Sequence, residues 1–425
     1  MKQAEIITMG CRLNLAESNA LHQALGQQAL GQQHSDGIDN LIIINSCAVT
    51  NEAVRQTRQA IRKAHKRRPD ARIIVTGCAA QIDPESFAAM PEVTTVLGNA
   101  EKQQPHLFLE KSRNNNILVS DIMTIAETAP HLVTAFSGKT RAFVEIQNGC
   151  DHRCSFCIIP YGRGNSRSVP AGSVVEHIRK LVGEGFCEVV LTGVDVTSYG
   201  HDLPGRPNLG QLVERIFKYV PDLPRLRLSS VDGIEIDERL FDLITGEPRL
   251  MPHVHLSLQS GDNMILKRMK RRHSRELATG LVQRMQARRP EIAIGADIIA
   301  GFPTEDEAMF ENSVKLIDDC QIVHGHIFPY SAKAGTPAAK MPQVNSRIIK
   351  ERAAILREKV AAKRAVWLSG LIGSEQKIAA EKGGMGGHAE NFAYVKFDRQ
   401  MAESAVISAR VMGVQDGNLH AEILP

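Results

Sequence analysis

The stretch Gly149-Cys-Asp-His-Arg-Cys-Ser-Phe-Cys157 places Cys150, Cys154 and Cys157 at C-x3-C-x2-C spacing on one short loop. Three thiolates at this spacing can hold three irons of a [4Fe–4S] cluster and leave the fourth iron open to a small ligand. A structural zinc ion would need a fourth protein ligand. The nearest candidate, His152, lies between the first two cysteines and would need a strained turn to join them. The spacing therefore favours an iron–sulfur cluster with one open iron over a zinc site.

Six short apolar runs around this loop predict parallel strands separated by helices. The runs are Ala142–Gln147, Glu188–Thr192, Arg225–Leu228, His253–Leu258, Ile294–Ile299 and His324–Phe328. Amphipathic helical stretches, such as Ser173–Glu184 and Glu276–Arg289, lie between them. This series predicts an incomplete (β/α)6 barrel rather than a closed eightfold one, with its chemistry at the carboxyl ends of the strands.

Polar residues fall where those strand ends are expected. In chain order they are Asp195 after the second strand, Ser229, Ser230 and Asp232 after the third, Gln259 and Ser260 after the fourth, Asp297 near the end of the fifth, and Tyr330 after the sixth. Because the cysteine loop follows the first strand, we expect these side chains to share one site with it.

The first hundred residues contain a second strand–helix pattern. Its strands are predicted at Glu5–Thr8, Leu41–Asn45 and Arg72–Thr76, and they end just before Cys11, Cys47 and Cys78, respectively. Ligands collect beyond the carboxyl ends of the strands in an open parallel sheet, so these three cysteines can converge on one site. The alternative is three unrelated buried cysteines. The repeated placement favours a shared metal.

The texture of the chain changes after a charged amphipathic helix at Arg347–Leu368. Four alternating runs follow, interrupted by the glycine cluster Gly383–Gly387; they are Gln376–Ala380, Phe392–Phe397, Val406–Val411 and His420–Leu424. They predict a small antiparallel β-barrel of a kind that often handles RNA. The chain is therefore expected to be an α/β protein, with an open parallel sheet over residues 1–106, a linker over 107–137, a partial barrel over 138–368 and the β-barrel over 369–425.

The composition of the 425 residues, 43% hydrophobic and 23% charged, is that of a soluble globular protein. We find no signal peptide and no apolar run long enough to span a membrane. The eight scattered cysteines do not form a secreted disulfide pattern. We therefore expect a cytoplasmic protein without a membrane partner. The net charge of +4 is too small to indicate nucleic-acid binding by itself.

Four motifs in this order resemble the radical S-adenosylmethionine (radical-SAM) methylthiotransferase family. They are Met9–Asn14 (MGCRLN), Asn45–Thr50 (NSCAVT), Thr76–Gln81 (TGCAAQ) and the C-x3-C-x2-C loop. The resemblance covers essentially the whole chain, and the C-terminal β-domain looks like the family's TRAM RNA-binding module.

Two further stretches, Cys157–Gly164 (CIIPYGRG) and Ser166–Pro170 (SRSVP), look most like one branch of that family. This branch converts N6-threonylcarbamoyladenosine at tRNA position 37 to its 2-methylthio derivative. The chain departs from the family at Ser46, where threonine is common, and in a glycine-rich hinge at Gly383–Gly387. Neither departure touches a cluster ligand, but the second leaves the RNA contacts of the tail open.

The resemblance implies an enzyme with two [4Fe–4S] clusters and S-adenosyl-L-methionine (SAM). The cluster on Cys150, Cys154 and Cys157 would reduce SAM to a 5′-deoxyadenosyl radical that attacks C2 of the adenine. The cluster on Cys11, Cys47 and Cys78 would carry the sulfur, first methylated by another SAM. C2 is an unactivated carbon, so a cofactor must supply this chemistry. The remaining cysteines, Cys187 and Cys320, are interpreted as buried core residues.

Six residues are candidates for binding SAM. By the resemblance, Gly193 and Asp195 lie where the SAM amino group is bound, although Asp195 could instead cap a helix. Phe156 is placed to pack near the SAM adenine, or is an ordinary core aromatic residue. Ser229, Gln259 and Asp297 have the strand-end placement that ribose or methionyl contacts require.

Basic residues suggest contacts with tRNA. Arg55, Arg58, Arg62 and Lys66 fall on one helical face in a stretch without acids, which suits phosphate binding or is a solvated face. Arg271 and Arg272 belong to a second basic cluster after the fourth barrel strand. Arg163 is the candidate for pairing with the threonylcarbamoyl carboxylate. In the alternative, Arg163 only braces its loop, against Asp151.

Other functions stay open at this point. A methylthiotransferase of isopentenyl-adenosine tRNA, or of a ribosomal-protein aspartate, is of the same class. Asn165–Ser168 argues mildly against both, because those branches usually place an acid after the Arg-Gly pair. A non-catalytic RNA-binding protein stabilised by metals would need a fourth ligand at each site. The expected partners are tRNA and an electron donor that the sequence does not identify.

Overall fold

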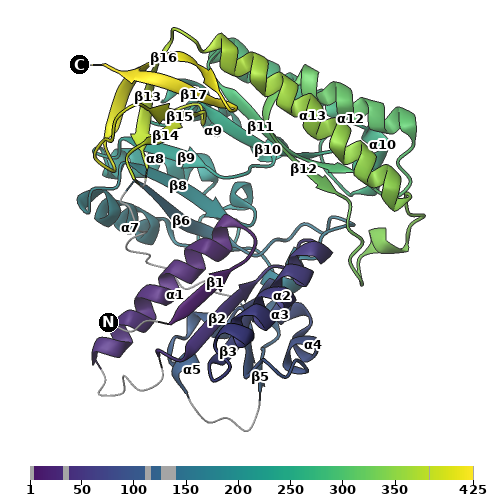
Figure 1. The fold of residues 1–425 in the computed structure, drawn as a ribbon. Helices are drawn as coiled ribbons and strands as arrows, with labels where there is room; N and C mark the ends of the chain where they lie inside the picture. The colour runs from purple at the N-terminus through teal and green to yellow at the C-terminus, as the bar shows by residue number, and fades with distance from the viewer. Residues whose placement is uncertain (1–3, 32–37, 111–115, 126–139, 382, 425) are drawn as a thin grey trace.

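The computed structural model describes residues 4–31, 38–110, 116–125, 140–381 and 383–424 (Figure 1). Its strands form an N-terminal parallel sheet, a central set of barrel strands and a closed C-terminal barrel. The predicted α/β architecture is therefore confirmed.

The N-terminal sheet has five parallel strands in sequence order. The strands are β1 (Glu5–Thr8), β2 (Leu41–Ser46), β3 (Arg72–Gly77), β4 (Thr95–Leu97) and β5 (Ile117–Leu118). The helices beside them are α1 (Arg12–Gly31), α2 (Asn51–Arg67), α3 (Cys78–Ile82), α4 (Pro84–Ala88) and α5 (His106–Leu109). The prediction contained three of these strands; β4 was missed, and β5 lies in the segment predicted as a linker.

The strand β2 shows why this sheet forms. Leu41 and Ile43 pack on one face with side chains of α1 and α5, and Ile42 and Ile44 pack on the other with side chains of α2, α3 and α4. A parallel strand that is covered on both faces has no polar side, so it is a continuous apolar run in the sequence.

The central barrel has six parallel strands. They are β6 (Arg141–Asn148), β8 (Glu188–Gly193), β9 (Arg225–Leu228), β10 (His253–Gln259), β11 (Ala293–Ala300) and β12 (Ile322–Pro329). A short strand, β7 (Arg167–Ser168), pairs antiparallel with β6. Two isolated bridges lie between the first three barrel strands and the last three: Leu226 of β9 pairs with Leu250 before β10, and Val231 after β9 pairs with Leu256 of β10. This arrangement confirms the incomplete barrel.

Helices surround the barrel on its outside. They are α7 (Ala171–Gly183), α8 (Leu209–Tyr219), α9 (Glu238–Gly246), α11 (Arg275–Arg288), α12 (Glu307–Asp319) and α13 (Ser346–Gly370). Two shorter helices follow the first and fourth barrel strands: α6 (Ile159–Arg163), which contacts α3, and α10 (Asn263–Arg268). On β10, Val254, Leu256 and Leu258 belong to the core beneath the surrounding helices. Because side chains alternate along a strand, His253 and His255 face the inside of the barrel.

The C-terminal strands close into a barrel in the order β13-β14-β15-β17-β16. They are β13 (Glu375–Ala380), β14 (Gly386–Ala389), β15 (Tyr394–Phe397), β16 (Val406–Gln415) and β17 (Asn418–Ile423). Four of the five strand pairs are antiparallel, as predicted, but β15 and β17 are parallel.

The interpretation of the glycine cluster as a hinge was wrong in part. Gly383 and Gly384 have positive φ and form a turn, but Gly386 and Gly387 belong to β14. A Cβ on Gly387 would lie 1.9 Å from the carbonyl oxygen of Ala379 on β13. Glycine is needed there because two backbones approach closely.

The C-terminal barrel is anchored on the base of the central barrel. Arg227 donates hydrogen bonds to the carbonyl oxygens of Ala389 and Glu390. The ring of Phe392 stacks on His253, with centroids 4.7 Å apart. Phe392 therefore closes the end of the central barrel opposite the cysteine loop.

One acid holds three arginines at this base. Glu188 is fully buried, and its carboxylate pairs with Arg141 at 2.5 Å, Arg225 at 3.0 Å and Arg227 at 3.1 Å. Burial alone would raise the pKa of Glu188, but the charges of the three arginines hold that pKa well below its usual range.

We expect Glu188→Gln to lower the free energy of unfolding by about 3–5 kcal/mol, because three buried cations lose their common partner. Denaturant unfolding measures this effect, and Glu214→Gln, in an exposed pair with Arg239, is the control. The pKa of Glu188 falls on folding, so its contribution is present above about pH 4.5 and is lost as the pH falls further. A Glu188→Gln protein as stable as the control would contradict this role.

Among the described helices, none is both long enough and apolar enough to span a membrane.

Candidate active site

A tight turn at the end of β6 places the cysteine loop of the barrel. Gly149 has φ +73, and a Cβ on it would lie 1.9 Å from the carbonyl oxygen of Asn165. The N–H of Cys150 donates to the carbonyl oxygen of Gly164 at 3.1 Å, so the loop folds back on itself. Within the loop, the N–H of Cys157 donates to the carbonyl oxygen of Cys154.

Charged groups from the other strand ends surround this loop. The thiol of Cys150 lies 3.6 Å from Oδ2 of Asp195, and Nη1 of Arg271 lies 3.8 Å from the sulfur of Cys154. Burial raises the pKa of Cys157 to about 11. Three thiols on one loop with an arginine beside them fit an iron–sulfur cluster, which takes thiolates as ligands.

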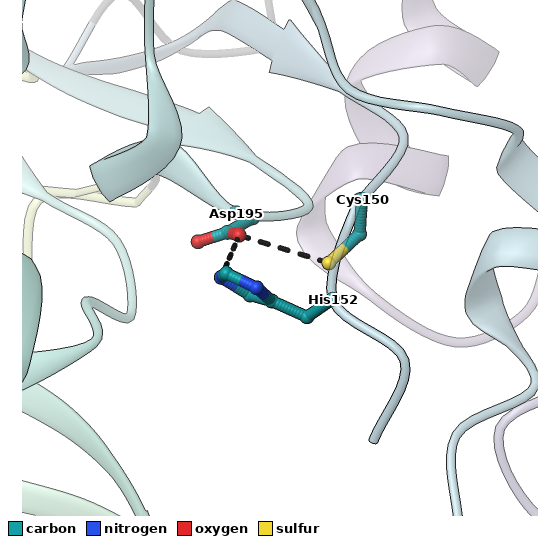
Figure 2. A group of neighbouring side chains, drawn as sticks. All are labelled: Cys150, His152 and Asp195. Atoms are coloured by element: carbon teal, nitrogen blue, oxygen red, sulfur yellow. Dashed lines mark hydrogen bonds and ion pairs between the residues drawn. The ribbon is translucent and has the colours of Figure 1, made fainter. Parts of the chain in front are cut away.

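His152, considered above as a fourth metal ligand, contacts two carboxylates. Figure 2 shows His152 and Cys150 both pointing at Asp195, and Nε2 of His152 lies 2.9 Å from Oδ2 of Asp195. Hydrogen bonds to Asp195 and Glu235 raise the pKa of His152 to about 10. The His152 ring is therefore paired with carboxylates. It also lies close enough to Cys150 and Asp195 for these three residues to hold a metal ion.

The predicted SAM-binding residues divide into two groups. Phe156, Gly193, Asp195, Ser229 and Gln259 lie on the cysteine loop or at strand ends of the barrel. Asp297 lies inside β11 instead, where its carboxylate contacts two histidines. Asp297 lies near the end of the fifth barrel strand, as predicted, and its contact with SAM stays a prediction.

Several members of the first group have features that suit a ligand. The hydroxyl of Ser229 is buried without a hydrogen-bond partner in the described part of the chain. Gln259 has φ +68, a strained conformation for a residue with a side chain. A Cβ on Gly193 would lie 2.6 Å from the carbonyl oxygen of Gln147, so the backbone is closely packed there. The ring of Phe156 meets Phe302 edge-to-face, with centroids 6.4 Å apart.

The three N-terminal cysteines follow β1, β2 and β3, and their loops meet. A Cβ on Gly10 would lie 2.7 Å from the sulfur of Cys47. Burial raises the pKa of Cys47 to about 11, and the charges of Cys78 and Cys11 contribute to this rise. Cys11 is exposed and the other two are buried. Because the three sulfurs are close enough to interact electrostatically, they can bind one metal cluster together.

Arg163 was predicted to contact the substrate, and the structure contradicts this. Its side chain is only 2% exposed and forms an ion pair with Glu17 and a hydrogen bond to Asn14, both on α1. Its Nε lies 3.1 Å from the sulfur of Cys78. Arg163 therefore connects the segment after the barrel cysteines to the N-terminal cysteines. Its role is structural, as in the alternative considered above, but its partners are Glu17, Asn14 and Cys78 instead of Asp151.

We expect Arg163→Gln to lower the free energy of unfolding by about 3 kcal/mol, because Glu17 loses a buried partner while Lys102 still pairs with it at 2.6 Å. Denaturant unfolding tests this, with Arg163→Lys as the variant that keeps the charge but not the forked geometry. Loss of substrate preference at unchanged stability would instead favour a substrate contact.

Arg271 is also not a surface residue. Its Nη2 donates to Asp232 at 2.9 Å and to the carbonyl oxygen of Ser257 at 2.8 Å, beside the cysteine loop. Its assignment to an RNA surface was therefore wrong. Arg272 is about half exposed and pairs with Glu235 at 2.7 Å.

The basic face of α2 is solvent-facing. Thr57, Ile61 and Ala64 are the buried residues of this helix. On the other side, Arg55 pairs with Glu52 and Arg58 lies over the ring of Phe87, while Arg62 and Lys66 are exposed. The start of α2 contacts the barrel, because the side chain of Asn51 donates to the carbonyl oxygen of Ala332. This face therefore stays a candidate for RNA contacts.

Sequence reasoning missed several residues near the two cysteine groups. Lys333 is buried, and its pKa is lowered by burial and partly restored by the charge of Cys47. Asn14 and Glu17 follow Cys11 at helical spacing on one face of α1, which was a signal available in the sequence. For Lys333 the sequence contains no such signal.

Comparison with known proteins gives family matches over both cysteine-bearing parts. A family model described as the radical SAM superfamily matches residues 144–317, and one described as uncharacterized protein family UPF0004 matches residues 3–98. The threonylcarbamoyladenosine tRNA methylthiotransferase MtaB of Rickettsia prowazekii is 50% identical over 97% of this chain and 96% of its own length. MtaB of Aquifex aeolicus is 37% identical over 84% of this chain and 87% of its own.

A solved structure supports the likeness of fold. The radical S-adenosylmethionine methyltransferase TsrM from Kitasatospora setae aligns with a TM-score of 0.56 over 80% of this chain and 75% of its own. At 16% identity, this similarity concerns the fold alone.

Proposed function

Because this chain belongs to the MtaB family of threonylcarbamoyladenosine tRNA methylthiotransferases, we propose that it adds a methylthio group to C2 of N6-threonylcarbamoyladenosine at tRNA position 37. It is a radical-SAM transferase, and its substrate is a tRNA. The observation that carries the proposal is the link from the segment after the barrel cysteines, through Arg163, to Cys78 of the N-terminal group.

The enzyme uses SAM and a [4Fe–4S] cluster, as radical-SAM proteins do. We propose that Cys150, Cys154 and Cys157 hold this cluster. SAM cleaved at such a cluster supplies a radical able to react at an unactivated carbon, which a protein side chain cannot do. We propose a second cluster on Cys11, Cys47 and Cys78, supported by the meeting of their loops.

The residues around the barrel cysteines orient SAM in this proposal. Asp195 accepts from the SAM amino group, and the unpaired hydroxyl of Ser229 and the amide of Gln259 bind its polar parts. Gly193 lets the backbone approach, and Phe156 packs against an apolar face. Arg271, beside Cys154, compensates negative charge on the thiolates.

Further proposals concern the setting of the reaction. The domains are proposed to span 1–106, 138–368 and 369–425, with a linker at 107–137. The C-terminal barrel would act as a TRAM-like RNA-binding module, together with Arg55, Arg58, Arg62 and Lys66 of α2 and the half-exposed Arg272. Reductive cleavage of SAM requires an electron donor. A cytoplasmic location is proposed, where tRNA is modified.

We expect anaerobically reconstituted protein to contain roughly eight irons and roughly eight sulfides per chain, because two cubane clusters each hold four of either. Metal and sulfide analysis measures this. A content near four irons would remove the second cluster, and zinc in place of iron after anaerobic purification would remove both.

The activity itself is tested with tRNA and mass spectrometry of its nucleosides. Holoenzyme, SAM and dithionite should convert threonylcarbamoyl tRNA to the 2-methylthio form and leave isopentenyl tRNA unchanged. Modification of only the isopentenyl tRNA would contradict the proposed substrate and support the proposed reaction, methylthiolation. A protein that binds tRNA and never cleaves SAM would support a non-catalytic role.

A further inference from the structure

An arginine beside the N-terminal cysteines has no hydrogen-bond acceptor among the described residues. Arg12 follows Cys11 and is the first residue of α1. Its guanidinium lies over the rings of Phe143 and Phe392, 5.9 Å and 5.6 Å from their centroids. In the part of the chain that the structure describes, no oxygen accepts a hydrogen bond from it. Arg12 is nevertheless an exposed residue, so a ligand can reach its side chain.

The contacts of Arg12 show where it lies. Phe143 is on β6, and its neighbours Ala142 and Val144 belong to the outer core, so Phe143 faces the inside of the barrel. Loss of hydration lowers the pKa of Arg12, as does the charge of Arg141, whereas Glu188 and Asp297 raise it. Arg12 therefore extends from its place beside Cys11 along the inner wall of the barrel towards Phe392.

A polar group on β10, β11 and β12 lies near this arginine. Asp297 contacts Nε2 of His255 at 3.0 Å and Nδ1 of His326 at 3.2 Å. The side chain of His326 is 59% exposed, whereas His255 is only 7% exposed. Because Nδ1 of His326 points at the carboxylate, its Nε2 is the atom available to a ligand. Asp297 thus fixes the orientation of His326.

The substituent of the proposed substrate matches these groups. C2 and C6 of adenine flank the same ring nitrogen, so a base with C2 close to the N-terminal cysteines also brings its N6 group close to Cys11. The threonylcarbamoyl group ends in a carboxylate and a hydroxyl. A guanidinium binds a carboxylate through paired N–H donors, and a neutral imidazole nitrogen accepts from a hydroxyl.

Resting on the proposed function, we propose that Arg12 binds the carboxylate of the threonylcarbamoyl group and that His326, oriented by Asp297, binds its hydroxyl. Arg163 is already engaged by Glu17, Asn14 and Cys78 and does not take this role. The alternative occupant of His255, Asp297 and His326 is a divalent cation, since two imidazoles and a carboxylate are a common ligand set.

The test compares two anticodon stem-loops, one with threonylcarbamoyl-adenosine and one in which its carboxylate is a carboxamide. Holoenzyme should prefer the carboxylate form in kcat/KM by roughly ten- to a hundredfold, the size expected for a charge-assisted pair. Arg12→Gln should lose this preference by slowing only with the carboxylate form, and Arg12→Lys should retain part of it. Arg284→Gln, in an exposed pair with Glu238 on the outer helices, should behave like the unaltered enzyme.

Three readouts separate this inference from other causes. Iron content and slow formation of 5′-deoxyadenosine without substrate should be unchanged in Arg12→Gln. If Arg12→Gln loses iron, the inference is tested without this variant. The carboxylate preference of the unaltered enzyme and the effect of His326→Phe then decide it. His326→Phe should lower kcat/KM several-fold for threonylcarbamoyl-adenosine but not for an analogue without the hydroxyl.

Retention of the full carboxylate preference in Arg12→Gln would overturn the inference while leaving the proposed function intact. The absence of any preference in the unaltered enzyme would do the same. A stoichiometric divalent metal other than iron, lost in His326→Phe, would show that the histidines bind a cation. Failure of the unaltered enzyme on every threonylcarbamoyl tRNA would instead refute the proposed function.

Discussion

Replacement of Cys154 by alanine should abolish the formation of 5′-deoxyadenosine from SAM. We expect a rate at least roughly a thousandfold below normal, because the catalytic centre is lost. The reason is local. Cys150 and Cys157 are the other thiols of the loop, and both are already assigned to the same cluster. The remaining cysteines outside the two groups, Cys187 and Cys320, are buried in the core and cannot replace the missing sulfur. Chromatography of the SAM products after dithionite reduction measures the effect.

Cys320→Ala is the matched control for this variant, because Cys320 is fully buried among core side chains and lies far from the loop in sequence. It should keep full SAM cleavage and iron content. Cleavage of SAM by the Cys154→Ala protein would mean that the radical chemistry does not depend on this loop.

Replacement of Cys47 by alanine should also eliminate the methylthiolated nucleoside, but through the other group of cysteines. SAM should still be cleaved slowly to 5′-deoxyadenosine, because the barrel loop and its neighbours Asp195 and Arg271 are untouched. Mass spectrometry of tRNA nucleosides and analysis of SAM products, run on the same sample, measure both results. The iron content should fall to about half.

The contrast between the two cysteine variants is the informative result. Equal loss of SAM cleavage in Cys47→Ala and Cys154→Ala would contradict separate roles for the two groups. Lys333→Met is a useful third variant, because it changes a residue near Cys47 and leaves all six cluster cysteines in place.

Most of the strands could be predicted from the sequence because burial on both faces leaves a local pattern. Leu41–Ile44 is such a run, and Arg225–Leu228 was predicted with the bounds it has. β4 has three residues, which is too short for a periodic signal. β14 begins with Gly386 and Gly387, which sequence rules assign to turns. The need for glycine there comes from Ala379 on another strand, which only the folded chain shows.

The positions of the six candidate ligands follow from spacing, but the functions of the arginines do not. Arg163 pairs with Glu17, 146 positions away along the chain, and no local pattern indicates that contact. Arg271 lies in a basic run typical of a surface, yet Asp232 and Ser257 draw it into the site. Arg12 was overlooked because a single arginine in a cysteine motif gives no sequence signal of its own. Its contacts with Phe143 and Phe392 appear only in the folded chain.

The bond from Arg163 to Cys78 also has a mechanical consequence. Arg163 ends the short helix α6, which begins just after Cys157, so a rigid spacer connects the two sulfur-bearing loops. A displacement of the N-terminal sheet against the barrel would have to break this hydrogen bond or carry α6 along with Cys78. The separation of the two sulfur-bearing loops is then set by α6 and by the hydrogen bond of Arg163 to Cys78.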